Sequence, residues 1–351
     1  MSTIREVAAL AGVSLSTVSI VINGQAQARK ITPATCEKVR NAVQQLDYKP
    51  NIAARKLRLS ADSDSVTIAL FWANDFRTTM LSRFLQGMQR QIIGDSSVEL
   101  VVMTYLSGQL SHQPSLLDGR RFHAAIIANA SEEDIRFLEQ TNLKFPVVLY
   151  NRESSRYSYV TVDERKMGQM AAEELLSRGH KNICALTSAG NFTYMRERDE
   201  GLLSAYQAAG YPIYADRIIQ TDSSLSGGAA ACRKALDAMI PCTAIYCASD
   251  AIALGALRML YDRGIQVPEQ LSVISIGNGE SSYATYAVPA LSNIYLPMET
   301  MAEKCLELAR EAVASPTAAP QRICLPTPFQ QRESLGPAPQ RTSQSSEKLS
   351  R

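Results

Sequence analysis

Residues 3–58 carry apolar side chains at the spacing of short helices. Apolar positions recur every three or four residues in three runs, 4–11, 14–23 and 32–46, which is the pattern of amphipathic helices. Gly12 follows the first run, where a left-handed residue ends a helix at little cost. Thr32-Pro33 opens the third run as a cap followed by a first-turn proline. We therefore predict three short helices, then a fourth, very short one over residues 52–58.

The pattern changes at Val66, where short apolar runs begin to alternate with helical stretches. Runs that are apolar at every position are typical of parallel strands covered by helices on both faces. The alternation continues to residue 330, which is long for one sheet, so we predict two doubly wound lobes with a cleft between them. The predicted strands include residues 66–72, 99–105, 124–128, 146–150, 182–187, 243–248 and 271–276.

These patterns divide the chain into four parts. Residues 1–50 form a small all-α head, 51–65 a short helix with a polar linker, and 66–330 a two-lobed α/β body. Residues 331–351 are rich in Ser, Pro and Gln, which predicts a disordered tail.

Charge separates the head from the body. The chain has 351 residues and a formal net charge of +2, but nine Lys or Arg and only three acids lie within residues 1–60. The remainder is mildly acidic, with 27 basic and 31 acidic residues. A basic head on an acidic body favours a polyanion-binding module joined to a second function.

Several classes of protein are not expected. No apolar run approaches the ~18–20 residues of a membrane span, and the first residues lack the apolar core of a signal peptide. The seven cysteines form no C-x-x-C pair, which favours reduced thiols in the cytoplasm and no metal site. None of the three histidines lies in a pattern with a partner carboxylate or nucleophile. Nucleophile-elbow, zinc-protease, Walker and dinucleotide-binding motifs are missing from the sequence. We expect neither an enzyme nor a bound cofactor.

The first two helices have the offsets of a helix-turn-helix. Ala8 is small where the helices cross, Gly12 supplies the turn, and Val18 holds the second helix against the first. In a docked helix-turn-helix, the second helix meets base edges and phosphates. The alternative is a plain three-helix bundle without a DNA role. The outer face of the second helix carries Leu15, Ser16, Thr17, Ser19, Ile20 and Asn23.

Two stretches, Thr3–Asn23 and Leu46–Arg58, closely resemble the head of the lactose/galactose repressor (LacI/GalR) family. The resemblance extends over about residues 2–330 and implies a body similar to periplasmic binding proteins. It implies a transcriptional regulator, with a repressor as the favoured form, that binds double-stranded operator DNA. By the resemblance, Leu15, Ser16 and Ile20 read bases, while Thr17, Ser19 and Asn23 contact phosphates.

One position departs from the family's head. Members often have arginine where Ile20 stands, and isoleucine packs on a thymine methyl instead of gripping guanine. Arg29 and Lys30, in a longer connection, are expected to add phosphate contacts; the alternative is a solvated basic loop.

Residues 52–58 resemble the family's hinge helix. Seven residues are too few for a stable helix in water, where ~12–15 are marginal. The segment is therefore expected to fold against its twin on DNA, which implies a homodimer on a pseudo-palindrome. Leu57 resembles the leucine wedged into the minor groove; the alternative is a linker leucine packed on the body. The expected DNA-contacting residues of the hinge are Asn51, Ala54, Leu57 and Arg58.

The body's resemblance implies an effector site in the cleft. Asp163, Arg198, Ser249 and Asp250 match effector-binding positions, although Asp250 could instead only cap a helix. Gly277 stands where members commonly have an acid. Because Arg198 suits an anion, and the family's stacking aromatics are replaced at 80–81 and 222–223, the hypothesis is a phosphorylated or acidic sugar.

Two other classes remain as alternatives. The body alone would suit the solute-binding protein of a transport system, but the basic head argues against it. A two-lobed sugar-processing enzyme would need a catalytic constellation, which the sequence does not offer. His180, between a helix-ending glycine and a strand, is predicted to be structural.

Overall fold

The computed structural model describes residues 4–22, 26, 29, 31–46, 65–75, 80–94, 97–119, 121–189 and 192–339. The head contains three helices, α1 (Ile4–Ala11), α2 (Leu15–Ile22) and α3 (Pro33–Gln45). Gly12 takes the left-handed conformation at φ 64°, and the Thr32 side chain accepts a hydrogen bond from the Thr35 N–H at 3.3 Å. The first three predicted helices, the turn and the cap are therefore confirmed, whereas the predicted fourth helix over residues 52–58 lies outside the described residues. The small core of the head is Val7, Ala8, Ala11, Val18, Cys36, Val39 and Ala42.

In the described part of the chain, no single helix is long and apolar enough to cross a membrane. Helices α1 and α2 meet that test of length and composition only as a pair, and they are bent by 102° at their junction.

Lobe 1 is a six-stranded sheet in the order β11-β5-β4-β3-β1-β2, with every neighbouring pair parallel. Its helices are α5 (Leu81–Ile92), α6 (Pro114–Asp118), α7 (Glu132–Gln140) and α13 (Met298–Ala314), with a short 3-10 turn at Leu110–His112. Its strands are β1 (Val66–Ala73), β2 (Val98–Tyr105), β3 (Ala124–Ala128), β4 (Val147–Tyr150), β5 (Ser158–Val162) and β11 (Arg322–Leu325).

Lobe 2 is a second six-stranded sheet in the order β12-β10-β9-β8-β6-β7, parallel except for the short β12. Its helices are α8 (Glu164–Ser177), α9 (Thr193–Ala208), α10 (Leu225–Asp237), α11 (Asp250–Asp262) and α12 (Ser281–Tyr286), with a 3-10 turn at Ala215–Arg217. Its strands are β6 (Ile183–Ser188), β7 (Ile218–Thr221), β8 (Ala244–Cys247), β9 (Ser272–Gly277), β10 (Ser292–Tyr295) and β12 (Phe329–Gln330).

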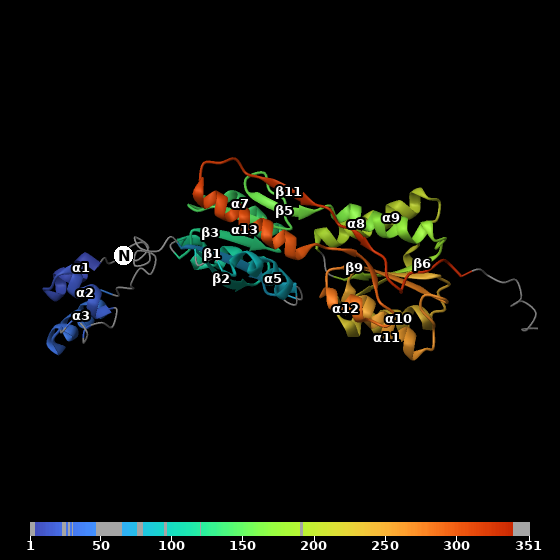
Figure 1. Ribbon diagram of the computed structural model, residues 1–351, viewed down its shortest axis with the longest axis horizontal. Coiled ribbons are helices and arrows are strands. Elements are labelled where there is room, and N and C mark those ends of the chain that lie inside the picture. Colours follow the sequence, from blue (N-terminus) through green and yellow to red (C-terminus); the bar gives the residue numbers. More distant parts are fainter. Residues whose placement is uncertain are drawn as a thin grey trace, which may run out of the picture.

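The chain passes between the lobes three times, after β5, β10 and β11 (Figure 1). Each passage leaves from the carboxyl end of a parallel strand. The carboxyl ends of the two sheets therefore meet at the junction between the lobes, which is where ligands bind in open parallel sheets. The predicted pair of doubly wound lobes is confirmed.

Helices α8 and α9 of lobe 2 touch backbone to backbone. A Cβ added to Gly168 would lie 1.9 Å from the carbonyl oxygen of Arg198, and one added to Gly201 would lie 2.0 Å from that of Arg165. Only glycine allows this approach. The crossing fixes the start of α8 against the first turns of α9, and both helix starts contribute to the site described below.

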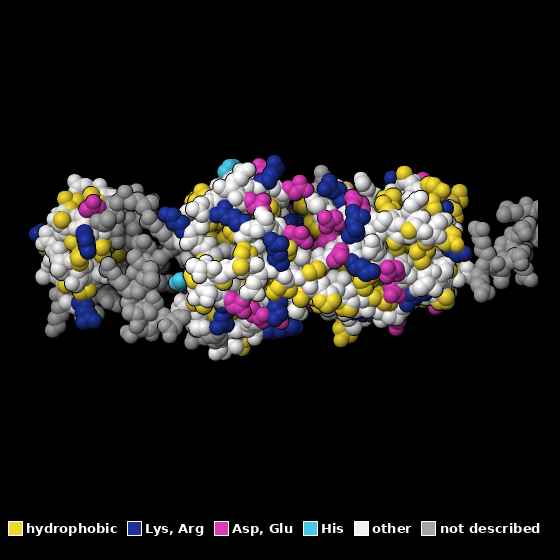
Figure 2. All heavy atoms as spheres, turned by 90° about the horizontal axis from the view of Figure 1, so that it is seen from above, with side chains coloured by type: hydrophobic (Ala, Val, Ile, Leu, Met, Phe, Trp, Pro, Cys, Tyr) yellow, Lys and Arg dark blue, Asp and Glu magenta, His cyan; other side chains and the backbone are white. Residues whose placement is uncertain are grey.

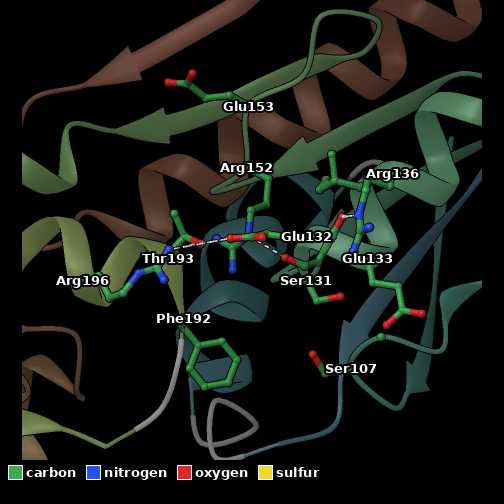
Figure 3. Close-up of a pocket in the computed structure, with 13 residues that line it drawn as sticks. Ser107, Ser131, Glu132, Glu133, Arg136, Arg152, Glu153, Phe192, Thr193 and Arg196 are labelled. Atoms are coloured by element: carbon green, nitrogen blue, oxygen red, sulfur yellow. Dashed lines mark hydrogen bonds and ion pairs between the residues drawn. The ribbon is translucent and has the colours of Figure 1, made fainter.

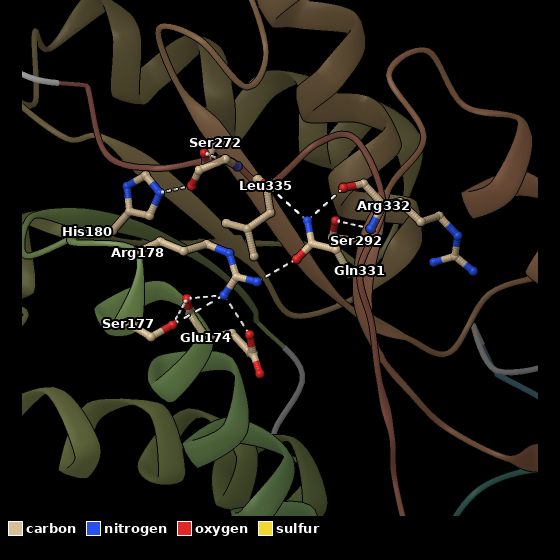
Figure 4. A network of polar contacts seen from close by, with 10 residues as sticks. Glu174, Ser177, Arg178, His180, Ser272, Ser292, Gln331, Arg332 and Leu335 are labelled. Atoms are coloured by element: carbon tan, nitrogen blue, oxygen red, sulfur yellow. Dashed lines mark hydrogen bonds and ion pairs between the residues drawn. The ribbon is translucent and has the colours of Figure 1, made fainter.

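Residues 331–339, which we call the C-terminal strap, cross lobe 2 in an ordered path (Figure 4). Ser334 is fully buried and its hydroxyl donates to the Val273 carbonyl at 2.7 Å. His180 holds the strap through Gly336, whose carbonyl lies 3.0 Å from Nε2. The predicted disorder from residue 331 is therefore wrong for these nine residues: buried serine and backbone hydrogen bonds order them where apolar side chains are few. His180 is structural, as predicted.

Candidate functional site

The second helix of the head presents the predicted DNA-reading side chains. Ser14 caps α2, because the Thr17 N–H donates to its hydroxyl at 3.1 Å, and Val18 is fully buried against the other two helices. Leu15 is 42% exposed although apolar, so its side chain is accessible to a partner. The exposed or half-buried positions also include Ser16, Thr17, Ser19, Ile20 and Arg29. Six further predicted contacts lie outside the described residues: Asn23, Lys30, Asn51, Ala54, Leu57 and Arg58.

In lobe 1, two asparagines follow adjacent strands directly. Asn129 comes after β3 and Asn151 after β4, and both have left-handed backbones, with φ 59° and 54°. The strand register pairs Ala128 with Tyr150 on one side and with Trp72 on the other. Left-handed non-glycine residues are uncommon and cluster at functional sites. This edge of the sheet therefore turns polar side chains toward the junction of the lobes.

Lobe 2 contributes a buried ion pair at the same junction. Arg198, on α9, donates through Nε and Nη2 to both carboxylate oxygens of Glu164, the first residue of α8. The two side chains are only 3% and 4% exposed. Asn151 of lobe 1 donates to Glu164 Oε1 at 2.9 Å. One carboxylate thus joins a strand end of lobe 1 to the arginine of lobe 2.

Buried polar atoms around this pair lack partners among the described residues. Arg198 Nη1, Trp72 Nε1 and Asn129 Nδ2 are unused donors, while Asn151 Oδ1 and Asp199 Oδ1 are unused acceptors. The hydroxyl of Tyr246, on β8, is also without a hydrogen bond. Buried polar groups are nearly always satisfied in proteins. We call these six atoms the orphan cluster, and their gathering at one junction marks a place for a polar ligand.

Burial changes the ionisation of this region. It raises the pKa of Asp199 from 3.8 to about 7, against the opposing charge of Arg198. Burial also raises the pKa of Tyr246 well above its ordinary value. For Arg198, burial acts to lower the pKa, but Glu164 outweighs it and the pKa is raised. The arginine therefore stays charged and the tyrosine neutral, and the raised pKa brings the titration of Asp199 close to neutral pH.

An open pocket of about 620 Å³ lies where α7 of lobe 1 faces α9 of lobe 2 (Figure 3). Glu132, at the start of α7, accepts a hydrogen bond from Thr193 and lies 3.9 Å from Arg196 Nη2, so it links the lobes. Arg152 lines the pocket, and its guanidinium lies 4.8 Å from the centre of the Tyr194 ring. The Arg198 guanidinium lies 5.3 Å from the same ring. The pocket is therefore adjacent to the Arg198 site.

A second buried arginine fastens the lobes on another side of the junction. Arg83, on α5, is 1% exposed and donates to both oxygens of Glu299 at 2.6 and 2.7 Å. It also donates to the carbonyls of Gly277, Gly279 and Leu296 at 3.3, 2.8 and 2.9 Å. Gly277 and Gly279 belong to lobe 2, so a lobe 1 side chain holds the end of β9. We call this arrangement the Arg83 clasp.

Three of the four predicted effector residues lie outside the orphan cluster and contact other groups of the protein. Asp163 is exposed and caps α8, accepting the Lys166 N–H at 2.8 Å. Ser249, expected to meet the ligand, caps α11 through the Ile252 N–H at 3.2 Å. Asp250, expected to be the cap, is 2% exposed and accepts hydrogen bonds from Ser275, Gly279 and Asn293. Only Arg198 lies in the orphan cluster.

Sequence reasoning missed Glu164, Asn151 and Asp199. Glu164 directly follows the predicted Asp163, so the sequence located the strand–helix junction but not the acid that turns inward. Asn151 follows a predicted strand directly, and Asp199 is next to the predicted Arg198. Polar residues immediately after buried parallel strands are the signal that would have identified Asn129 and Asn151.

Comparison with known proteins identifies both parts of the chain. Residues 3–51 match the family described as "Bacterial regulatory proteins, lacI family", and residues 157–335 match the "Periplasmic binding protein-like domain". The transcriptional regulator CelR of Thermobifida fusca is 30% identical over 343 residues, covering 95% of this chain and 98% of CelR. The probable repressor ExuR of Bacillus subtilis is 27% identical over 341 residues, covering 95% of this chain and 98% of ExuR.

Solved structures agree with these relatives. A CelR–cellobiose complex is 28% identical, with a TM-score of 0.67, over 95% of this chain and 100% of that one. The lac repressor dimer bound to operator and anti-inducer, at 22% identity and a TM-score of 0.69 over 95% and 98% of the two chains, shares the fold. The relatives are named as regulators or repressors of transcription, not as enzymes. The chain belongs to the LacI family of bacterial transcriptional regulators, with a DNA-binding head and an effector-binding body.

Proposed function

We propose that the protein is a cytoplasmic repressor that binds a pseudo-palindromic operator as a homodimer and is switched by a small, uncharged, hydroxyl-rich metabolite held between the lobes. The orphan cluster is the observation that carries the effector site. Its unused donors and acceptors are mixed, and a hydroxyl group serves both because it donates and accepts. Sugars and polyols have this chemistry.

The ion pair of Arg198 with Glu164 weakens the sequence-based hypothesis of a phosphorylated or acidic sugar. That hypothesis requires a guanidinium free to pair with the ligand, whereas two of its nitrogens already bind a carboxylate. A relative solved with cellobiose and one named for the ribose operon are consistent with a neutral sugar. We therefore prefer the uncharged class for this chain.

Exposed apolar side chains support dimerisation of the body. Ile93, next to α5, is 72% exposed, and Tyr261, Tyr286 and Val288, in or next to α11 and α12, are 76%, 82% and 90% exposed. Helices α5 and α12 lie on the same, lower side of the two lobes in Figure 1. Large apolar side chains on one side of a molecule mark an interaction surface. Helices α5 and α13 pack on each other within lobe 1, so α5 offers only its outer face.

Switching follows from contacts that cross the junction. The ligand would bridge Asn151 of lobe 1 and Arg198 of lobe 2, and so favour one arrangement of the lobes over another. We assign residues 1–50 to the head and 51–65 to the hinge helix and linker, and we extend the body from 66–330 to residue 339. Within this scheme, Leu15, Ser16 and Ile20 read bases and Leu57 wedges into the minor groove.

Two measurements test this function. Selection of binding sites from random duplex DNA, with the wild type and Leu57→Ala, should recover a pseudo-palindrome that the variant binds about tenfold or more weakly. Enrichment of no sequence at any salt concentration would refute the regulator. A panel of neutral sugars and polyols in operator-release assays, repeated with Arg198→Met, tests the effector site; release that survives the substitution would place the ligand elsewhere.

A further inference from the structure

The sign of the charge at the proposed effector site depends on Glu164. This carboxylate is almost fully buried and occupies two of the three guanidinium nitrogens of Arg198. The glycine crossing at Gly168 and Gly201 fixes α8 against α9, so the two partners belong to one rigid unit. The pair therefore stays together when the lobes move, and Arg198 does not offer a free positive charge.

The surroundings add no net positive charge for an anion to use, because acids and arginines are balanced there. Glu197, on the same helix, and Asp199 are further acids, and burial raises the pKa of each. The pocket between α7 and α9, adjacent to the Arg198 site, is lined by three glutamates and three arginines. Acidic and basic side chains are interspersed near the junction of the lobes on the face shown in Figure 2. An anion that enters the site therefore loses its hydration shell, and the surroundings that replace it carry both positive and negative charges.

Hydrogen bonding also disfavours an anion beside Arg198. A carboxylate presents acceptors only, and a phosphate group mostly acceptors. Besides the unused donors Trp72 Nε1 and Asn129 Nδ2, such a group would find only Nη1 left on the guanidinium of Arg198. It would also meet the unused acceptor Asn151 Oδ1 and, wherever Asp199 is ionised, Asp199 Oδ1. Two acceptors facing each other without a proton are repulsive, and that cost rises in a buried site.

We propose that Glu164 is a specificity-determining residue that makes the site reject anionic metabolites by neutralising Arg198. Removal of its charge, with the shape kept, converts the same pocket into an anion site. This inference rests on the proposed effector site, but its test does not need the natural effector. Glutamine is close in size to glutamate and retains one acceptor for Arg198.

The test is calorimetric titration of the full-length protein with inorganic phosphate and with D-glucuronate. Wild type should give no saturable binding up to about 10 mM, whereas Glu164→Gln should bind both anions at least about tenfold more tightly. The double variant Glu164→Gln/Arg198→Met should lose that binding, which locates it at the guanidinium. Glu164→Asp retains the charge and should still exclude anions. Glu200→Gln is the matched control, because Glu200 pairs with Arg165 on the exposed side of the same helix pair.

The proposal remains testable if the Glu164→Gln substitution lowers the stability of the protein. A ligand that binds only the folded state raises its melting temperature, so phosphate should stabilise this variant against heat and leave the wild type unchanged. Saturable binding of either anion to the wild type, lost in Arg198→Met, would overturn the proposal. So would a Glu164→Gln protein that neither anion binds or stabilises. Operator binding is measured separately on the same proteins, and its absence would refute the proposed regulator without touching the anion result.

Discussion

Replacement of Arg83 by methionine should destabilise the body strongly at neutral pH. Arg83 makes five hydrogen bonds while 1% exposed. Methionine fills a similar volume but donates nothing, so three backbone carbonyls lose a hydrogen bond, although those of Gly277 and Leu296 keep a backbone N–H donor. Glu299 is left with the Tyr295 hydroxyl, at 2.8 Å, as its remaining side-chain donor. Removing one partner of a buried ion pair leaves an uncompensated charge and costs about 3–5 kcal/mol.

That cost corresponds to a fall of roughly 10 °C in melting temperature for a body of this size. Scanning calorimetry of the full chain measures it. Arg90→Met is the matched control: Arg90 lies on the same helix, is 65% exposed and pairs with Glu303 at 3.2 Å. Exposed pairs are worth below about 1 kcal/mol, so the control should melt within a few degrees of wild type.

The pH dependence supplies a second check on the Arg83 clasp. Burial acts to raise the pKa of Glu299, but hydrogen bonds and charge from Arg83 hold it below the ordinary 4.5. A depressed carboxyl pKa stabilises the fold above the unfolded value and loses this effect as pH falls through the folded one. The penalty of Arg83→Met should therefore shrink below about pH 4.5, and Arg83→Met/Glu299→Met should recover much of it at pH 7. A penalty that is independent of pH and unrelieved in the double variant would refute this account.

Three further predictions concern other parts of the body. Asp199→Asn should stabilise the protein increasingly as pH rises from about 4 through 7, because the raised pKa of Asp199 makes its ionised form costly in the fold; equal melting-temperature differences at pH 5 and pH 8 would contradict it. Gly201→Ala should separate α8 from α9, since the new Cβ would lie 2.0 Å from a carbonyl oxygen, and should abolish effector response while operator binding persists; a normal response would show that the crossing tolerates a methyl group. Burial lowers the pKa of His180, so its neutral form is favoured and the C-terminal strap should loosen as pH falls through 6.5; hydrogen exchange at residues 334–338, corrected for intrinsic rates, measures this, and unchanged protection at pH 5.5 would disprove it.

Local signals in the sequence were sufficient for much of the fold. Glycine after one helix and Thr-Pro before another are short-range effects, and the structure has the φ 64° turn at Gly12 and the cap at Thr32. Fully apolar runs likewise located the central strands, because a strand covered on both faces has few polar positions. In these cases the physics acts between residues that are close in the chain.

The site was harder to predict because it depends on contacts across long separations. The sequence analysis selected Asp163 as a site residue and missed Glu164. The two acids are adjacent, and a shift of one residue at the strand–helix junction determines which of them caps the helix and which turns inward. The partners Glu164 and Arg198 are brought together by a helix crossing, and Asn151 reaches Glu164 from the end of β4, across the first passage of the chain into lobe 2. The strap was missed because serine and backbone atoms, not apolar residues, hold it in place.

The threefold passage of the chain between the lobes has a consequence for synthesis on the ribosome. Domains fold as units, the N-terminal ones first, and the described helices of the head are complete by residue 45. Lobe 1 lacks α13 and β11 until residues 298–325 have been made, and lobe 2 lacks β12 until residue 330. Neither lobe can complete its sheet before residues 322–330 have been made. Interrupted synthesis before these residues therefore leaves a completed head on an unfinished body.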